Sequence, residues 1–196
     1  MYVRDARNRE EVWLLDRIEE MDLDAAAFRS RDYVVAIDED SNEKCGFGRV
    51  RLHKKEERSD VCELTGIGVL ESWRGQGVGA HVVERLVDRA GDEGFETVYS
   101  LTDESEYLER FGFERVAIDD LPDKIGERLD VKREGSVPEA VPTRIDVEAF
   151  SMPSQLRERF KHAAEDGAGD DEPAVEETPE DFGIDSENAT YKYDTG

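Results

Sequence analysis

The chain has 196 residues with 50 acidic and 26 basic side chains, which gives a formal net charge of −24 at pH 7. A chain this acidic repels nucleic-acid phosphates and anionic lipid headgroups, so we expect neither a nucleic-acid partner nor a membrane partner. The longest apolar runs are about five residues, against the ~20 that cross a bilayer, and the N-terminus lacks the apolar stretch of a signal peptide. Because two cysteines are too few for a disulfide scaffold, we expect a cytoplasmic protein.

The negative charge is uneven along the chain. Residues 165–196 hold 12 acidic residues, one lysine and few large apolar residues. Such a segment cannot bury enough surface to offset its loss of conformational entropy, so we predict a disordered acidic tail. Residues 1–164 suit one globular domain. Since that domain is also acidic and poor in lysine, we interpret the charge as a halophilic adaptation, with a field that attracts cationic substrates as the alternative.

The first third of the chain changes its hydrophobic period. Apolar residues at three- and four-residue steps predict a helix with Asn8 as its N-cap, whereas later runs are rich in β-branched residues and are separated by polar turns. The last three predicted strands would form an antiparallel meander. The predicted elements are a strand over 2–4, helices over 8–21 and 24–28, and strands over 32–38, 47–52 and 61–70.

The second part begins with a glycine-rich segment that leads into a helix. The strand after this helix must run parallel to the strand before the glycines, because a helix crosses between them. Residues 126–140 fit no clear pattern. The predicted elements are a helix over 80–90, a strand over 95–101, a helix over 103–110, a strand over 113–118, a turn or short helix over 121–125, a strand over 144–150 and a helix over 151–164.

Residues 74–80 read Arg-Gly-Gln-Gly-Val-Gly-Ala and join a predicted strand to a predicted helix. Glycines there let the backbone approach a ligand, and the free N–H groups of the helix start favour an anion such as a pyrophosphate. The spacing Gly75-x-Gly77-x-x-Ala80 also fits a dinucleotide fingerprint, but that motif needs further parallel strands. A P-loop is absent, since no Gly-Lys-Ser/Thr follows.

Arg74, Gly77 and Gly79 make the pattern Arg-x-x-Gly-x-Gly, which resembles the acyl-CoA motif of the GCN5-related N-acetyltransferase (GNAT) family. Residues 109–113, Glu-Arg-Phe-Gly-Phe, resemble its aromatic-Gly-Phe segment, and the order of elements over 2–118 agrees. The resemblance implies an α/β (α+β) fold, with a mixed central sheet, an antiparallel N-terminal meander and one parallel crossover at the CoA site. Residues 126–164 would be an extension that completes the domain. Thr102, Tyr107 and Asp120-Leu121-Pro122-x-x-Ile125 further resemble the N-acetylglutamate-synthase-like branch, and the acidic, lysine-poor chain looks like a haloarchaeal member.

The resemblance also implies how acetyl-CoA, the acyl donor, would bind. The strand over 64–70 would splay from its parallel neighbour, and the backbone groups of Ile67 and Val69 would pair with the pantetheine arm. The N–H near Ile67 would polarise the thioester carbonyl. Gly66 and Gly68 suit a close approach of backbone and ligand, or alternatively a bulge without a ligand role. The implied acyl-CoA-binding residues are Ile67, Gly68, Val69, Arg74, Gly75, Gln76, Gly77, Val78, Gly79, Ala80 and Thr102.

Two catalytic residues are expected. Glu63 lies where several family members carry a general base, and strand alternation would place it on one face with Thr65, Ile67 and Val69, where apolar neighbours would raise its pKa. A solvated glutamate is the alternative. The family's acid tyrosine corresponds to Leu108 here, so Tyr107 next to it either protonates the thiolate or only packs. The two cysteines should pack, and no metal site is expected.

The sequence therefore predicts an acetyl-CoA-dependent N-acetyltransferase that acts on the primary amine of a small molecule or amino acid by direct attack. Three alternatives remain open: a protein or peptide N-acetyltransferase, a non-catalytic acyl-CoA-binding module, and a nicotinamide-dependent enzyme. The expected partner is a small-molecule amine, and a homodimer is left open.

Overall fold

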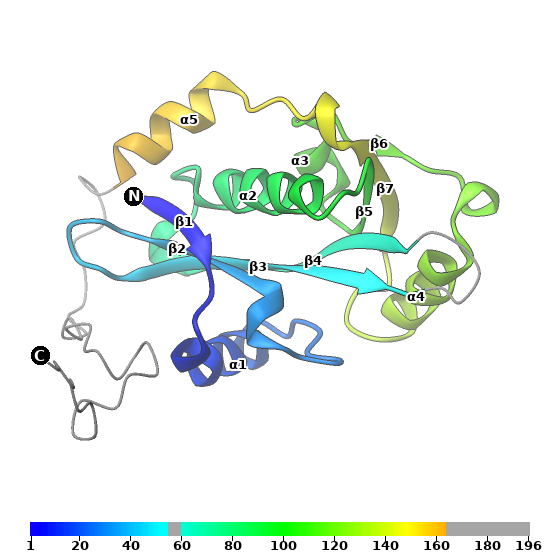
Figure 1. Ribbon diagram of the computed structural model, residues 1–196, viewed down its shortest axis with the longest axis horizontal. Helices are drawn as coiled ribbons and strands as arrows, with labels where there is room; N and C mark the ends of the chain where they lie inside the picture. Colours follow the sequence, from blue (N-terminus) through cyan, green and yellow to red (C-terminus); the bar gives the residue numbers. More distant parts are fainter. Residues whose placement is uncertain (55–59, 164–196) are drawn as a thin grey trace, which may run out of the picture.

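The computed structural model describes residues 1–54 and 60–163. Within them, strands form one open seven-stranded sheet in the order β1-β2-β3-β4-β5-β7-β6 (Figure 1). Only β4 and β5 run parallel among these described strands, and every other neighbouring pair is antiparallel. The strands are β1 (Tyr2–Asp5), β2 (Tyr33–Ile37), β3 (Lys44–His53), β4 (Val61–Val69), β5 (Thr97–Thr102), β6 (Glu114–Arg115) and β7 (Val141–Asp146).

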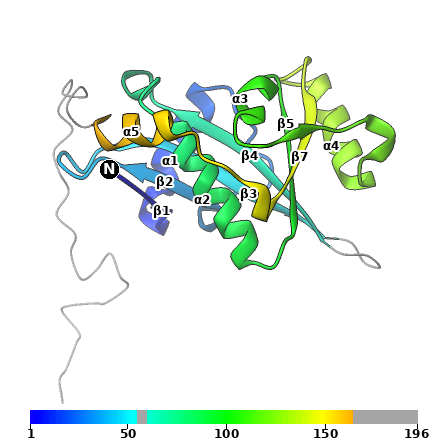
Figure 2. The ribbon, with the colours of Figure 1, turned by 90° about the horizontal axis from the view of Figure 1, so that it is seen from above.

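Helices cover both faces of this sheet (Figures 1 and 2). One face carries α1, and the opposite face carries α2 with α5 beside it. The α-helices are α1 (Glu11–Glu20), α2 (Val78–Asp92), α3 (Ser105–Glu109), α4 (Asp123–Glu134) and α5 (Ser154–Lys161). Over residues 1–54 and 60–163, no helix combines the length and the apolar character needed to cross a membrane.

The residues of β2 show why helices cover both faces of the sheet. All five of its residues are buried, and Val34 and Ala36 pack in the α2 core while Tyr33, Val35 and Ile37 pack in the α1 core. Side chains alternate across a strand, so a continuous apolar run is what a strand covered on both faces requires. The α2 helix supplies its layer from apolar positions three and four residues apart, which are Val82, Val83, Leu86, Val87 and Ala90.

The predicted mixed central sheet, its antiparallel N-terminal meander and its parallel crossover are confirmed. Three element predictions are wrong or misplaced. Residues 24–28 form a turn, in which Asp24 accepts the N–H of Ala26 and Ala27 has a φ of 51°. The predicted strand over 113–118 shrinks to β6, and β7 spans Val141–Asp146 in place of the strand predicted over 144–150. No element was predicted over 126–140, and α4 continues into this stretch from the turn or short helix expected at 121–125.

The start of the first helix also differs from the prediction. Residues Asn8–Glu10 form a 3₁₀ turn before α1, and Asn8 does not cap it. Instead the buried Glu10 carboxylate accepts the Arg7 N–H at 2.7 Å and pairs with Arg4 at 2.7 Å. The predicted acidic tail over 165–196 lies outside the described residues.

Candidate functional site

The parallel strands β4 and β5 separate part-way along their length. Their register pairs are Cys62 with Val98, Glu63 with Tyr99 and Leu64 with Ser100, and no pair follows among the described residues. Beyond this point a cavity of about 450 Å³ opens between the strands, as the splay prediction required. Gly66 and Ile67 have no register partner on β3 either, because the β3–β4 register shifts there.

Gly66 is the origin of this bulge. Its φ of 56° lies in the left-handed region, which glycine adopts without the strain that a side chain would bring. An added methyl group would meet nothing closer than 3.9 Å, so backbone conformation rather than crowding requires glycine here. A bulge inserts one extra residue into the strand. After Gly66, each side chain of β4 therefore points to the opposite face of the sheet from the one that regular alternation would give.

The expected common face of Glu63, Thr65, Ile67 and Val69 is therefore wrong. Ile67 and Val69 pack in the core under α2, whereas Glu63 lies against α4 on the other side of the sheet. Gly68 now points toward α1, and an added methyl group would lie 2.7 Å from the Met21 sulfur and from the Phe47 ring. The crowding explains glycine at this position without a ligand.

The segment 74–80 enters α2 with its backbone donors free. Gly77 is the N-cap of α2 and has a φ of 82°. The first hydrogen bond of the helix is donated by the His81 N–H to the Gly77 carbonyl at 3.2 Å. The N–H groups of residues 75–80 have no acceptor among the described residues. They lie at the positive end of the α2 dipole, a position that favours a negatively charged group.

The cavity reaches most of the residues expected to bind the donor. Arg74 lines it and donates its Nε to the Val69 carbonyl at 3.3 Å, and Thr102 lines it at the end of β5. The other expected residues in the lining are Ile67, Val69, Gly75, Gly77, Val78 and Gly79. Gln76, Gly68 and Ala80 are not in the lining: the Gln76 side chain donates to the Ser72 carbonyl at 2.9 Å, and Ala80 is buried in the core.

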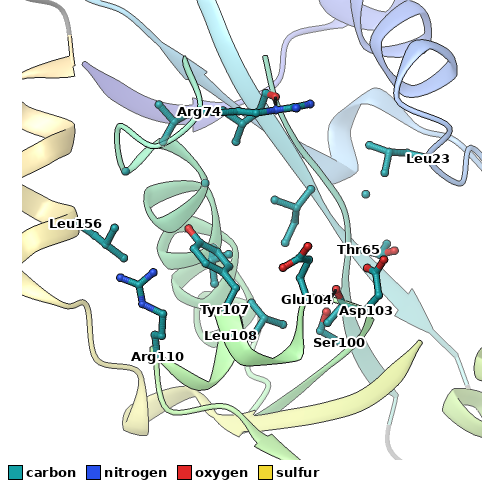
Figure 3. Close-up of a pocket in the computed structure, with 18 of the residues that line it drawn as sticks. Leu23, Thr65, Arg74, Ser100, Asp103, Glu104, Tyr107, Leu108, Arg110 and Leu156 are labelled. Carbon is teal, nitrogen blue, oxygen red and sulfur yellow. Dashed lines mark hydrogen bonds between the residues drawn. The ribbon is translucent and has the colours of Figure 1, made fainter. Parts of the chain in front are cut away.

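Tyr107 lies beside the loop over 74–80. Its hydroxyl would be 3.3 Å from a methyl group added at Gly79, and its ring packs edge-on against Phe111. Burial raises its pKa, an effect that the Arg110 charge opposes. Tyr107 and Leu108 both line the cavity and are labelled in Figure 3, and Leu108 is 4% exposed.

Glu63 is fully buried and is absent from the cavity lining. Its Oε2 lies 2.8 Å from His53 Nε2 and 3.4 Å from Arg128 Nε, and its Oε1 lies 3.3 Å from Lys132 Nζ. Burial alone would raise its pKa, but the His53 hydrogen bond and the two positive charges outweigh burial and lower the pKa to about 2. The expected raised pKa is therefore wrong, because cations rather than apolar groups surround the carboxylate.

Lys132 is a cavity residue that sequence reasoning missed. Its Nζ donates to Thr65 Oγ1 on β4 at 3.0 Å and to the Leu101 carbonyl on β5 at 2.9 Å, so it bridges the strands where they separate. Burial lowers its pKa, while Glu63 opposes the shift. The spacing of Ile125, Arg128 and Lys132 on α4 was the available signal, because it places two cations on a buried helical stripe.

Comparisons with known proteins agree with this architecture. Residues 2–113 match the model of the Acetyltransferase (GNAT) family. Rv2747 from Mycobacterium tuberculosis, solved with CoA and NLQ, superposes with a TM-score of 0.60 at 21% identity over 74% of this chain and 99% of its own. N-acetylglutamate synthase from Neisseria gonorrhoeae, solved with coenzyme A and N-acetyl-glutamate, gives 0.59 at 17% identity over 74% of this chain and 34% of its own.

The NatC complex bound to Gag peptide and CoA gives a TM-score of 0.52 at 16% identity over 74% of this chain and 99% of that chain. No curated protein sequence matches the chain significantly. These structural likenesses show the fold, and the family match covers more than half of the chain. The chain belongs to the GNAT acetyltransferase family.

Proposed function

We propose that the chain is an acetyl-CoA-dependent N-acetyltransferase that acetylates a primary amine of a small molecule or amino acid by direct attack. One observation carries the proposal: a loop with free N–H groups contributes Gly75, Gly77, Val78 and Gly79 to the lining of a cavity between two splayed strands. A diphosphate would accept these N–H groups, and an extended arm with amide groups would pair with the unpaired edge of β4.

The unpaired edge of β4 suits the reactive end of the donor. Ile67 has no register partner on β3 or β5, and its N–H is the group that would polarise the thioester carbonyl. A second hollow of about 900 Å³ shares Leu23, Ile67, Val69 and Arg74 with the cavity and reaches the α1 side of β4. An amine in this hollow would approach the thioester from the face opposite the donor, as direct attack requires.

We keep Glu63 as the proposed general base, but in an indirect role. A carboxylate with a pKa of about 2, paired with Lys132 and Arg128, is ionised at neutral pH but is a weak base. It lies outside the cavity lining, so it would act only through water or through His53. The nicotinamide alternative lacks support, since the described sheet has a single parallel pair where a dinucleotide fold needs several.

The test is thiol release from acetyl-CoA by the full-length protein with a panel of free amino acids, other small amines and peptides with free N-termini. Release stimulated about tenfold or more by a small amine supports the proposal. Stimulation by peptides alone would move the acceptor to the protein class. A screen at high salt avoids loss of the fold through charge repulsion.

Leu108, in place of the family's acid tyrosine, favours one second candidate, an acyl-CoA-binding module without turnover. Thermal protection separates the two, because a ligand that binds the folded state raises the melting temperature. Protection by acetyl-CoA without thiol release for any acceptor would favour the module. Protection by NAD but not by acetyl-CoA would overturn both candidates.

A further inference from the structure

Three arginines border the loop end of the cavity without an acidic partner. Arg74 comes from the loop, Arg110 follows α3, and Arg159 lies on α5. Among the described residues, none of the three forms an ion pair, although the chain has 50 acidic side chains. By contrast, Arg157 on α5 does not line the cavity and pairs with Glu84 at 2.7 Å.

Most of the donors on these arginines are unused. Arg159 Nη1 donates to the Gly75 carbonyl at 3.3 Å, while Arg110 lies 5.7 Å from the centre of the Tyr107 ring. A guanidinium carries five N–H donors, so each group can still grip an anion with two parallel bonds. Figure 3 shows Arg110 pointing toward Leu156 of α5, with Tyr107 between Arg110 and the acidic Glu104.

The α5 helix holds Arg159 at the loop. The Leu156 carbonyl packs so closely on Gly77 that no side chain would fit there. Phe160 stacks on His81 of α2 with ring centres 3.6 Å apart and planes 8° apart. A helix fixed at two points on the loop and on α2 gives Arg159 a defined place beside the free N–H groups.

CoA carries phosphate at two separate places, a diphosphate and a 3′-phosphate. The backbone donors of residues 75–80 suit the diphosphate. A phosphate monoester carries close to two negative charges at pH 7 and is held best by guanidinium groups. We propose that Arg110 and Arg159 form a second phosphate site, which binds the 3′-phosphate of the CoA donor and makes α5 part of the donor site. The proposal rests on the proposed use of acetyl-CoA.

The experiment measures the dissociation constants of CoA and 3′-dephospho-CoA for the full-length protein and three variants. We expect the wild type to bind CoA at least about tenfold more tightly than 3′-dephospho-CoA. Arg110→Gln and Arg159→Gln should each weaken CoA binding by roughly tenfold and leave 3′-dephospho-CoA binding unchanged. Arg157→Gln is the matched control on the same helix and should preserve the wild-type preference.

All three substituted side chains are exposed, so the variants should fold, and a thermal melt checks this. Equal affinity of the wild type for both ligands would overturn the second phosphate site while leaving the proposed function standing. A loss of both affinities in Arg159→Gln would also overturn it and assign Arg159 to the diphosphate. Failure of the wild type to bind either ligand would instead refute the proposed function.

Discussion

The buried carboxylate of Glu63 lies between the sheet and α4, against the positive charges of Arg128 and Lys132. His53, Arg128 and Lys132 all reach it, and Arg128 also pairs with Asp24. Removing one partner of such a cluster leaves the others buried without compensation, which destabilises a fold more than losing the pair as a whole. Glu63 is thus a stability determinant whatever its part in catalysis.

We predict that Glu63→Gln lowers the free energy of unfolding at pH 7 by about 3 kcal/mol, measured by urea denaturation. The lowered pKa means that the carboxylate stabilises the fold above its unfolded value of 4.5 and loses that effect as pH falls toward about 2. The variant should therefore show a shallower loss of stability between these two pH values. Glu109→Gln, at an exposed ion pair with Arg115, is the control and should change little.

The same substitution addresses catalysis. Because Glu63 is ionised throughout the neutral range, we expect any acidic limb of kcat/KM above pH 5 to persist in Glu63→Gln. Loss of that limb in a variant shown to be folded would restore Glu63 as the titrating base.

Tyr107→Phe should change kcat by less than about threefold, because the hydroxyl faces Gly79 at the loop and the ring packs on Phe111. Steady-state kinetics with varied acetyl-CoA would measure this. A loss of about 100-fold or more in kcat would show instead that Tyr107 protonates the leaving thiolate.

The sequence predicted that the loop over 74–80 lies at the cavity, because a glycine-rich strand-to-helix junction exposes backbone N–H groups whatever surrounds it, and all of its residues but Gln76 and Ala80 line the cavity. The pKa of Glu63 could not be predicted in this way. Its partners His53, Arg128 and Lys132 come from β3 and α4. They are distant from Glu63 in the sequence, so the residues next to Glu63 do not predict them.

Substitutions at two glycines of the loop distinguish the effect of backbone strain from the effect of packing against α5. Gly75 and Gly77 have φ values of 77° and 82°, but an added methyl group meets nothing at Gly75 and overlaps the Leu156 carbonyl of α5 at Gly77. We predict that Gly75→Ala lowers the free energy of unfolding by about 1 kcal/mol through backbone strain alone. Gly77→Ala should lower it by about 1–3 kcal/mol more, since α5 must shift.

Chemical denaturation measures both variants, and amide exchange in residues 154–161 reports on α5 directly. Equal stability losses for the two variants, with α5 exchange unchanged, would show that the α5 contact on Gly77 contributes nothing to stability.

Periodicity predicted the elements with a strongly apolar face but missed α4. The meander and α2 are rich in buried aliphatic residues, so their periods of 2 and 3.6 are plain. In α4 the buried positions are Ile125, Arg128, Leu129 and Lys132. Half of these buried residues are charged, so the sequence of α4 shows no clear apolar period. The bulge at Gly66 could not be predicted either, because a single glycine is compatible with both a bulge and a regular strand. Only a bulge reverses the face on which the following side chains lie.

Over the whole molecule, salt should affect the net charge of −24 and the proposed donor site in opposite ways. Like charges repel one another in the compact state, and the Debye screening length falls from ~10 Å at 0.1 M salt to ~3 Å at 1 M. The proposed donor site, in contrast, depends on Arg74 and the free N–H groups of residues 75–80, whose attraction for phosphate the same ions weaken.

We therefore predict that the melting temperature rises between about 0.1 and 2 M KCl, while the dissociation constant of CoA increases over the same range. Scanning calorimetry and isothermal titration would measure the two quantities, with sucrose as a non-ionic control for general stabilisation. A melting temperature that KCl leaves flat would show that the charge does not limit stability, against a halophilic interpretation. CoA binding that strengthens with KCl would show that the acidic surface outweighs the local positive field, so that the site works only when its surroundings are screened.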